Sequence, residues 1–371
     1  MKKSARFLAL VMAMLMLLVG CAQNPSTSVS APQTDAVKET EEVSASISTG
    51  NEGKEEEAPA VEEPAEEAEE SALLTEEEVG KKRVVLLVKQ LANTFFTEFV
   101  EYATKKCDEY GWDIEVLCPT VNNNNEEQIQ LVDQALLNPP DIFLIMPAEP
   151  AGFVPAVEKI NEAGIPLINV DDQIKDESVE ITTFIGADHY ELGKLMGTSA
   201  VELSGIENAK CLVIEGTTGS YSSITRYEGL KDALEGTGWE IVDSQPGNYS
   251  RADSFNVVQN LLQKHDDIDF IFFISATMAL GAHDAVVNSG QDIKCATVDT
   301  NKEVLELIQN SDHLMFTCDN AAWLQGYTSV ELAMKYFQGE QLDEQYMIAG
   351  ACVYPEAPEW AEYAERYGLA S

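Results

Sequence analysis

The stretch PLINVDDQI, residues 166–174, joins a short apolar run to two adjacent carboxylates. Its first part, Pro166 to Val170, has the apolar and β-branched composition of a buried strand. Asp171 and Asp172 follow directly, where that strand should end. Two charges at the end of a strand cost stability unless solvent, a partner or a ligand satisfies them. The stretch therefore bears on both the fold and the function.

Outward from this strand, the chain alternates short β-branched runs with longer amphipathic segments. Repetition of strand, helix and strand is typical of a parallel sheet with helices on both faces. We therefore predict an α/β fold with two lobes of similar design. The predicted strands, most of them separated by helices, are 83–88, 112–118, 142–146, 166–170, 181–186, 210–216, 239–244, 268–274, 294–299, 314–318 and 351–354.

The N-terminus has the features of an export signal. A basic start with Lys2, Lys3 and Arg6 precedes an apolar run that is shorter than the roughly 20 residues of a spanning helix. The run ends in LVGC, which is similar to a bacterial lipobox and predicts lipidation of Cys21. The alternative is a plain secretory signal with an incidental cysteine. We predict a signal peptide at 1–21 and attachment to the outer face of the cell membrane by a lipid alone.

Residues 22–81 are rich in Asp and Glu and poor in large apolar side chains. Such a segment buries too little surface to offset its ordering entropy, and like charges extend it. We predict a disordered acidic tether. The formal net charge of the whole chain is −41, which argues against a nucleic-acid partner, since such proteins need a basic patch.

Few residues suggest a metal, a cofactor or catalysis. Cysteines beyond Cys21 show no CxxC or metal spacing, and the four histidines are scattered. We predict no metal site and no cofactor. No base stands beside an evident nucleophile, so we predict that the protein is not an enzyme. Several of the cysteines lie in apolar runs that favour buried thiols, while export leaves disulfides open.

Polar and aromatic side chains recur directly after the predicted strands. Carboxylates accept hydrogen bonds from hydroxyl groups, amides both donate and accept them, and aromatic rings cover the C–H face of a sugar. This composition suits a polyhydroxyl ligand. The segments that carry it are QLANTFF (90–96), DDQ (171–173), EGTTGSYSSITRYEG (215–229), GNYSR (247–251), SATMALG (275–281), VDTN (298–301) and CDNAAW (318–323).

Taken in order, these segments resemble the ribose- and galactose-type solute-binding proteins of ABC sugar importers. The resemblance covers about residues 83–345 and rests on order and spacing rather than on one motif. The matching segments are LANTFF, AGIPLINVDDQ, TRYEG, NVVQNLL, MALGA, VDT and GYTSVELAMKYFQGE.

The resemblance implies two Rossmann-like lobes with parallel sheets, joined by a three-segment hinge and closing on a sugar or polyol. It also implies a monomer that delivers its ligand to an ABC permease. The hinge would lie near 186–189, 317–321 and 344–348. The first lobe would comprise 82–187 and 320–345, and the second 188–319 and 346–371.

Carried over residue by residue, the resemblance implies a ligand site made of residues from both lobes. Asn93 and Asn320 match binding amides, Phe95 and Phe96 match stacking rings, and Tyr249 matches a second-lobe aromatic. Asp171 and Asp299 match binding carboxylates. The implied ligand-binding set, including two positions where the residue type departs from the family, is Asn93, Phe95, Phe96, Asp171, Asp172, Tyr249, Ser275, Asp299 and Asn320.

The departures bear on which ligand is bound. Asp172 and Ile224 stand where the ribose-type pattern has arginines, and Ser275 stands where it has asparagine. Arg226 matches an arginine that the resemblance implies is structural, with Glu228 as its expected ion-pair partner. The site would then keep its acids without their cations. This pattern favours a different pentose, a hexose, a polyol or an amine-bearing ligand over ribose.

Three other functions share part of this pattern. A bilobed sensor that feeds a membrane receptor or kinase cannot be separated from an importer component by sequence; neighbouring genes would separate them. A sugar-metabolising enzyme would need a paired base and nucleophile. A Lac-repressor-type regulator would need an N-terminal helix-turn-helix, where this chain has a signal and an acidic segment.

Overall fold

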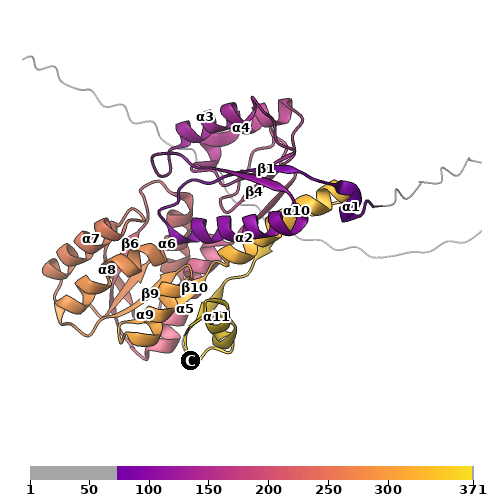
Figure 1. Ribbon diagram of the computed structural model, residues 1–371. Helices are drawn as coiled ribbons and strands as arrows, with labels where there is room; N and C mark the ends of the chain where they lie inside the picture. The colour runs from indigo at the N-terminus through magenta and orange to yellow at the C-terminus, as the bar shows by residue number, and fades with distance from the viewer. Residues whose placement is uncertain (1–72, 370–371) are drawn as a thin grey trace, which may run out of the picture. The chain divides into compact units, whose positions relative to one another are not determined.

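Two six-stranded sheets form the framework of the computed structural model, which describes residues 73–369 (Figure 1). The predicted signal peptide, Cys21 and most of the predicted tether lie outside the described residues. The first sheet is entirely parallel, and its order is β11-β5-β4-β3-β1-β2. Its strands are β1 (Arg83–Leu87), β2 (Asp113–Leu117), β3 (Ile142–Ile145), β4 (Leu167–Val170), β5 (Thr183–Ala187) and β11 (Gln345–Ile348).

The second sheet has the order β12-β10-β9-β8-β6-β7, with only β12 antiparallel to its neighbour. Its strands are β6 (Lys210–Glu215), β7 (Glu240–Pro246), β8 (Phe270–Phe273), β9 (Lys294–Val298), β10 (Leu314–Asp319) and β12 (Ala351–Val353). We call each sheet with its covering helices a lobe. The predicted α/β class is confirmed.

Helices cover both faces of each sheet because the central strands are apolar on both sides. In the first lobe, α2 and α10 cover one face, and α3 and α4 cover the other (Figure 1). The helices of this lobe are α1 (Glu76–Val79), α2 (Thr94–Tyr110), α3 (Asn125–Ala135), α4 (Pro150–Glu162) and α10 (Ala322–Gln338). Those of the second are α5 (His189–Ser204), α6 (Tyr221–Leu234), α7 (Arg251–Lys264), α8 (Ala276–Ser289), α9 (Lys302–Asn310) and α11 (Trp360–Arg366).

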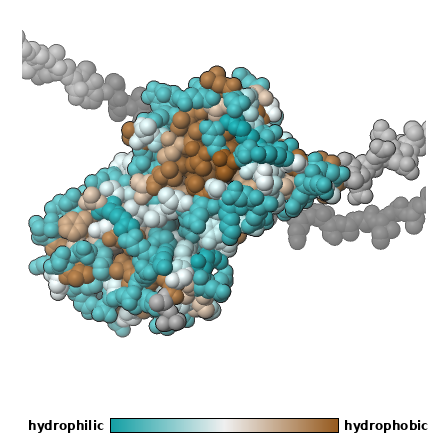
Figure 2. Space-filling model, viewed as in Figure 1, coloured by the Kyte–Doolittle hydropathy of each residue, from teal (hydrophilic) through white to brown (hydrophobic). Residues whose placement is uncertain are grey.

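The surface over the lobes is largely hydrophilic, in keeping with the acidic composition. Figure 2 shows one concentrated hydrophobic area in this view, over the first lobe between the α3–α4 layer and α2.

The described end of the predicted tether is ordered, contrary to the prediction for residues up to 81. Thr75 caps α1 with a reciprocal capping box to Glu78, and Val79 is buried. The backbone N–H of Leu74 donates to the carbonyl oxygen of Gln338 at 2.9 Å. A four-residue helix is marginal alone, so its packing on α10 supplies the stability that composition could not reveal.

Three connections cross between the lobes. They are residue 188 between β5 and α5, residues 320–321 between β10 and α10, and residues 349–350 between β11 and β12. The third lies beyond the predicted segment 344–348, because β11 through Ile348 pairs with β5 of the first sheet. The first lobe therefore extends past the expected boundary at 345.

Close contact of α5 with α6 in the second lobe depends on two glycines. A Cβ atom added to Gly193 would lie 1.9 Å from the carbonyl oxygen of Arg226, and one added to Gly229 would lie 2.0 Å from that of Tyr190. Both obstacles are backbone atoms, so the helices themselves would have to move apart. The two glycines therefore set the position of α6 and its Arg226.

Replacing Gly193 with alanine should lower the free energy of unfolding by about 1–3 kcal/mol, because added volume in a packed interface forces the backbone to shift. Urea denaturation would measure the change. Thr198→Ala, on the exposed face of the same helix, is the matched control and should change stability by less than about 0.5 kcal/mol. Equal stability of the two variants would contradict the close contact.

The C-terminal segment of the second lobe also contacts the first lobe. The hydroxyl of Tyr367 donates to Glu98 of α2 at 2.6 Å, and the Arg366 guanidinium lies 3.5 Å from the ring centre of Trp323 in α10. Burial raises the pKa of the Glu98 carboxyl to about 8, with Asp319 and Glu101 adding to the rise and Tyr367 and Arg366 opposing it.

The raised pKa of Glu98 predicts a specific pH dependence of stability. Between its ordinary value of 4.5 and about 8, the folded state holds a proton that the unfolded state has released. The free energy of unfolding should therefore fall as pH rises through this window, by up to about 4 kcal/mol. Glu98→Gln should remove this part of the slope. Urea denaturation of both proteins between pH 5 and pH 8, a range set by that window, gives the free energy of unfolding at each pH. If Glu98 is ionised throughout, the plots of this free energy against pH for the wild type and the variant would be parallel.

Candidate functional site

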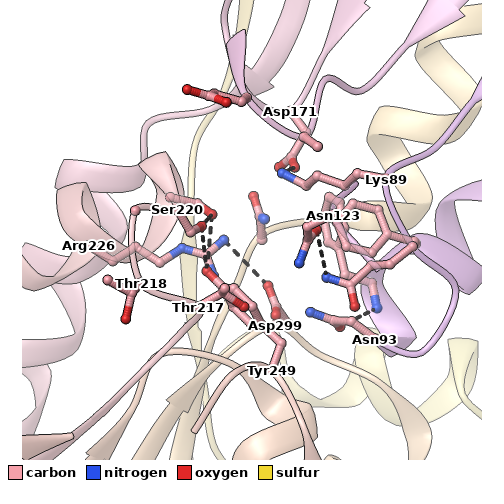
Figure 3. A pocket seen from close by; sticks show the side chains of 18 residues that line it. Lys89, Asn93, Asn123, Asp171, Thr217, Thr218, Ser220, Arg226, Tyr249 and Asp299 are labelled. Carbon is pink, nitrogen blue, oxygen red and sulfur yellow. Dashed lines mark hydrogen bonds and ion pairs between the residues drawn. The ribbon is translucent and has the colours of Figure 1, made fainter. Parts of the chain in front are cut away.

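A cavity of about 310 Å³ lies between the two lobes, at the carboxyl ends of their strands. Parallel α/β sheets place ligand sites at this edge, and the volume lies at the small end of the range for small-molecule pockets. Figure 3 shows polar side chains from both lobes pointing into it. Seven of the nine predicted ligand residues line the cavity: Asn93, Phe95, Phe96, Asp171, Tyr249, Asp299 and Asn320.

Backbone strain concentrates at this cavity. Six non-glycine residues among those described have positive φ, and each lines the cavity or directly adjoins a residue that does. Such conformations cost free energy and persist only where the surrounding structure fixes them, often at functional sites. The six residues are Asn123 (59°), Asp171 (67°), Asn248 (56°), Tyr249 (53°), Asp299 (74°) and Ala321 (51°).

Lys89 lies between the two carboxylates that follow β4. Its Nζ is 2.9 Å from Asp171 Oδ2 and 2.5 Å from Asp172 Oδ2. All three side chains are buried. Burial disfavours the charged lysine, but the two carboxylates outweigh that effect and raise the pKa of Lys89. The lysine is thus held as a cation at the wall of the cavity.

Asp172 does not line the cavity, contrary to its predicted role as a ligand residue. Its Oδ1 lies 3.0 Å from Nε2 of His189, and its Oδ2 lies against Lys89. Burial opposes ionisation of Asp172, but Lys89 and His189 prevail and lower its pKa. Asp172 therefore holds Lys89 in place behind Asp171. Although Asp172 stands where the family has an arginine, Lys89 supplies a positive charge beside it.

Arg226 provides the second cation at the site. Its Nη1 donates to the carbonyl oxygen of Ile274 at 2.9 Å, and its Nη2 lies 3.6 Å from Asp299 Oδ1. The expected pairing with Glu228 is wrong, because side chains two residues apart on a helix point to different sides. Burial raises the pKa of Asp299, and Arg226 opposes that rise. The prediction of acids without cations is therefore wrong for both lobes.

Several buried polar atoms of the lining residues have no hydrogen-bond partner among the described residues. They are Arg226 Nε, Asp299 Oδ1 and Asn320 Nδ2. Buried polar groups are otherwise almost always paired, so these atoms are suited to bind a polar ligand. The Oδ1 of Asn320 already accepts from Gln325 Nε2 at 3.1 Å, which leaves its amide nitrogen to donate.

Ser275, the other predicted ligand residue outside the cavity lining, is fully buried at the start of α8. Its hydroxyl makes no capping hydrogen bond. Thr277, the second residue of the helix, instead donates to Asn93 Oδ1 at 3.4 Å across the lobes. The hydroxyl of Ser275 has no hydrogen-bond partner among the described residues.

Three of the predicted ligand residues that line the cavity are aromatic. Phe95 and Phe96 meet edge to face, with ring centres 5.1 Å apart, and Lys89 Nζ lies 5.4 Å from the Phe96 ring centre. The hydroxyl of Tyr249 is 3.2 Å from the hydroxyls of both Ser220 and Ser222. The Tyr249 ring also lies against Gly216, where a Cβ would approach it to 2.3 Å.

Comparison with known proteins places this arrangement in a family. Residues 84–341 match the family model described as the periplasmic binding protein domain, which is well over half of the chain. The chain belongs to this family. The periplasmic binding protein fold explains the two lobes, and the predicted resemblance is confirmed.

Two comparisons illustrate how similar other proteins are to this periplasmic binding protein. The ribose import binding protein RbsB of Escherichia coli is 29% identical over 271 residues, which cover 73% of this chain and 90% of the relative. A crystal structure of an ABC transporter solute-binding protein from Bacillus halodurans, with bound myo-inositol, is 25% identical with a TM-score of 0.70. That match covers 78% of this chain and 99% of the other.

Sequence reasoning missed several lining residues of this periplasmic binding protein. Lys89 directly follows the first strand, so the rule that drew attention to Asp171 would have found it. Arg226 falls in the segment 215–229 that follows a strand, but the resemblance gave it a structural role. Four missed residues lie outside the segments singled out after the strands: Lys89, Asn123, Ala148 and Glu149. The others lie within those segments but were not assigned as ligand residues: Gln90, Thr217, Thr218, Gly219, Ser220, Ser222 and Arg226.

Asp171, Asp172 and His189 lie close enough together to hold a metal ion. The histidines are far apart in the sequence, so this cluster was not predicted. The Lys89 ammonium, however, already lies between the two carboxylates and supplies positive charge there. The donor set therefore fits an internal cation better than a metal.

Within residues 73–369, every helix is too short or too polar to cross a membrane.

Proposed function

We propose that this protein is the substrate-binding component of an ABC importer and captures a sugar or polyol between its lobes. The observation that carries the proposal is the cavity itself, where both lobes contribute carboxylate, amide and aromatic side chains. Relatives in the family bear the names of ribose- and allose-binding proteins. Binding rather than catalysis also agrees with family membership.

The charges at the cavity favour a neutral ligand. Lys89 lies between the two carboxylates of the first lobe and Arg226 faces Asp299 in the second, so these groups set two cations against three carboxylates and leave only a small excess of negative charge. A polyhydroxyl compound can both donate to Asp171 and Asp299 and accept from the amide of Asn320. The excess of acids that favoured an amine-bearing ligand is smaller than expected, and such a ligand remains the alternative.

Ligand capture would proceed by lobe closure about the three connections. Because each lobe supplies part of the lining, a ligand makes its full set of contacts only when both lobes are in place. It would favour closure by this difference in affinity between the states. A permease would then recognise the closed form.

We further propose that the protein acts outside the cytoplasm as a monomer, held at the cell membrane by a lipid on Cys21. The basic start, apolar run and LVGC ending of residues 1–21 support this placement. The acidic segment that follows would give the lobes reach from the membrane to the permease.

A thermal-shift and calorimetric screen tests the proposed ligand class. The panel would hold D-ribose, D-allose, myo-inositol and D-galactose, with glucosamine and ribose 5-phosphate as charged counterparts. At 100 times its dissociation constant, a ligand should stabilise the fold by about 2.7 kcal/mol. A neutral member should bind more tightly than either charged one. Binding of glucosamine alone would overturn the neutral-ligand proposal, and no stabilisation by any member would count against sugar capture.

A further inference from the structure

Strands β10 and β12 of the second lobe carry two cysteines that face each other. Between these two strands the chain passes through the first lobe. β10 and β12 pair antiparallel, and their register sets Cys318 directly opposite Cys352. Directly opposite residues of an antiparallel pair have Cα atoms about 4.5–5.5 Å apart, with side chains on the same face of the sheet. That separation lies within the range of about 4.4–6.8 Å that a disulfide spans.

The two thiols differ in accessibility in a way that suits stepwise oxidation. Cys318 is fully buried, while Cys352 is only partly buried on the edge strand. Hydrogen bonding from Cys318 lowers the pKa of Cys352, with a further contribution from Ser199, although burial opposes it. Burial instead raises the pKa values of Cys318 and of the four other cysteines, Cys107, Cys118, Cys211 and Cys295, so Cys352 is the thiol that reacts first.

We propose that Cys318 and Cys352, both free thiols in this structure, form a reversible disulfide that fastens β12 to β10. The oxidant is a low-molecular-weight disulfide or a thiol–disulfide oxidoreductase outside the cytoplasm. The Cys352 thiolate attacks one sulfur of the oxidant and releases the first thiol. Cys318 then loses its proton and attacks Cys352 Sγ, which releases the second thiol. Two electrons pass from the cysteine pair to the oxidant disulfide.

The position of this pair gives the disulfide a consequence for the site. The chain leaves the second lobe just after Cys318, forms α10 and β11 in the first lobe, and returns just before Cys352. A disulfide between Cys318 and Cys352 would therefore join two of the three connections, 320–321 and 349–350, where they leave and re-enter the second lobe. Without it, β12 is held by a ladder of only three residue pairs. Cys318 also lies two residues before Asn320 of the cavity.

Peptide mapping after controlled oxidation tests the assignment. The full chain is reduced, treated with glutathione disulfide, unfolded in the presence of N-ethylmaleimide and digested for mass spectrometry. We expect one linked peptide pair that contains Cys318 and Cys352, with maleimide on Cys107, Cys118, Cys211 and Cys295. Maleimide on both Cys318 and Cys352, a lasting glutathione adduct on Cys352, or a covalent dimer through Cys352 would each overturn the proposal.

Variants and stability supply a second readout. Cys352→Ser changes a partly buried position and should abolish the linked peptide, while Cys295→Ser on the neighbouring strand β9 should leave it intact. The oxidised wild-type chain should melt several degrees above its reduced form, since a cross-link restricts the unfolded chain. This difference should vanish in Cys352→Ser. A linked peptide without any rise in Tm would show that the bond does not fasten the strand.

Discussion

Replacing Asp171 with alanine should weaken sugar binding by at least about 100-fold. The carboxylate lines the cavity in a strained backbone conformation that the fold imposes at the end of β4. Charge-assisted hydrogen bonds contribute about 1.5–3 kcal/mol each, so losing two of them accounts for this factor or more. Isothermal titration with the best ligand of the screen measures the loss.

Two further variants separate this effect from indirect ones. Asp171→Asn tolerates the left-handed backbone and keeps an acceptor, so it should bind with intermediate affinity. Asp108→Ala removes an exposed carboxylate from α2 and should bind as the wild type does. Wild-type affinity in Asp171→Ala, with the fold intact by circular dichroism, would show that Asp171 serves Lys89 and not the ligand.

Replacing Lys89 with methionine should lower the free energy of unfolding by about 3–5 kcal/mol. The substitution leaves two buried carboxylates, Asp171 and Asp172, without the cation that lies between them. Removing one member of a buried ion pair has an effect of this size because a buried charge remains uncompensated. Urea denaturation at neutral pH measures the change.

A double variant tests whether the loss arises from charge. Lys89→Met with Asp172→Asn removes one of the two stranded charges and should recover part of the stability, which a double-mutant cycle quantifies. The deficit of Lys89→Met should also shrink in acid, where protonation relieves the carboxylates. A deficit that is the same at every pH and in the double variant would point to lost packing by the lysine stem.

The sequence predicted the lobes well because their strands are apolar runs whose pattern depends little on the rest of the fold. It missed α1, with the sequence EEEV, and β11, with the sequence QYMI, because each is only four residues long and becomes regular through packing on α10 or pairing with β5. Tertiary context decides such elements, and no local pattern records it.

The site was predicted less completely, because charge pairs form between residues far apart in the chain. Lys89 follows β1 and Asp172 follows β4, with β3 between these strands in the sheet. The strand-end rule identifies both residues but not their ion pair. For Arg226, the nearest acid in sequence was the wrong partner, because the helix directs the guanidinium toward Asp299.

The placement of cations and carboxylates has a consequence for how the surface of this protein can vary. Lys89 with its two aspartates belongs to the first lobe, and Arg226 with Asp299 belongs to the second. Neither of these pairings has to form or break when the lobes approach each other. Pairing of these charges within each lobe therefore makes ligand capture less dependent on the acidic exterior, so exterior charge can change during evolution with little effect on the cavity.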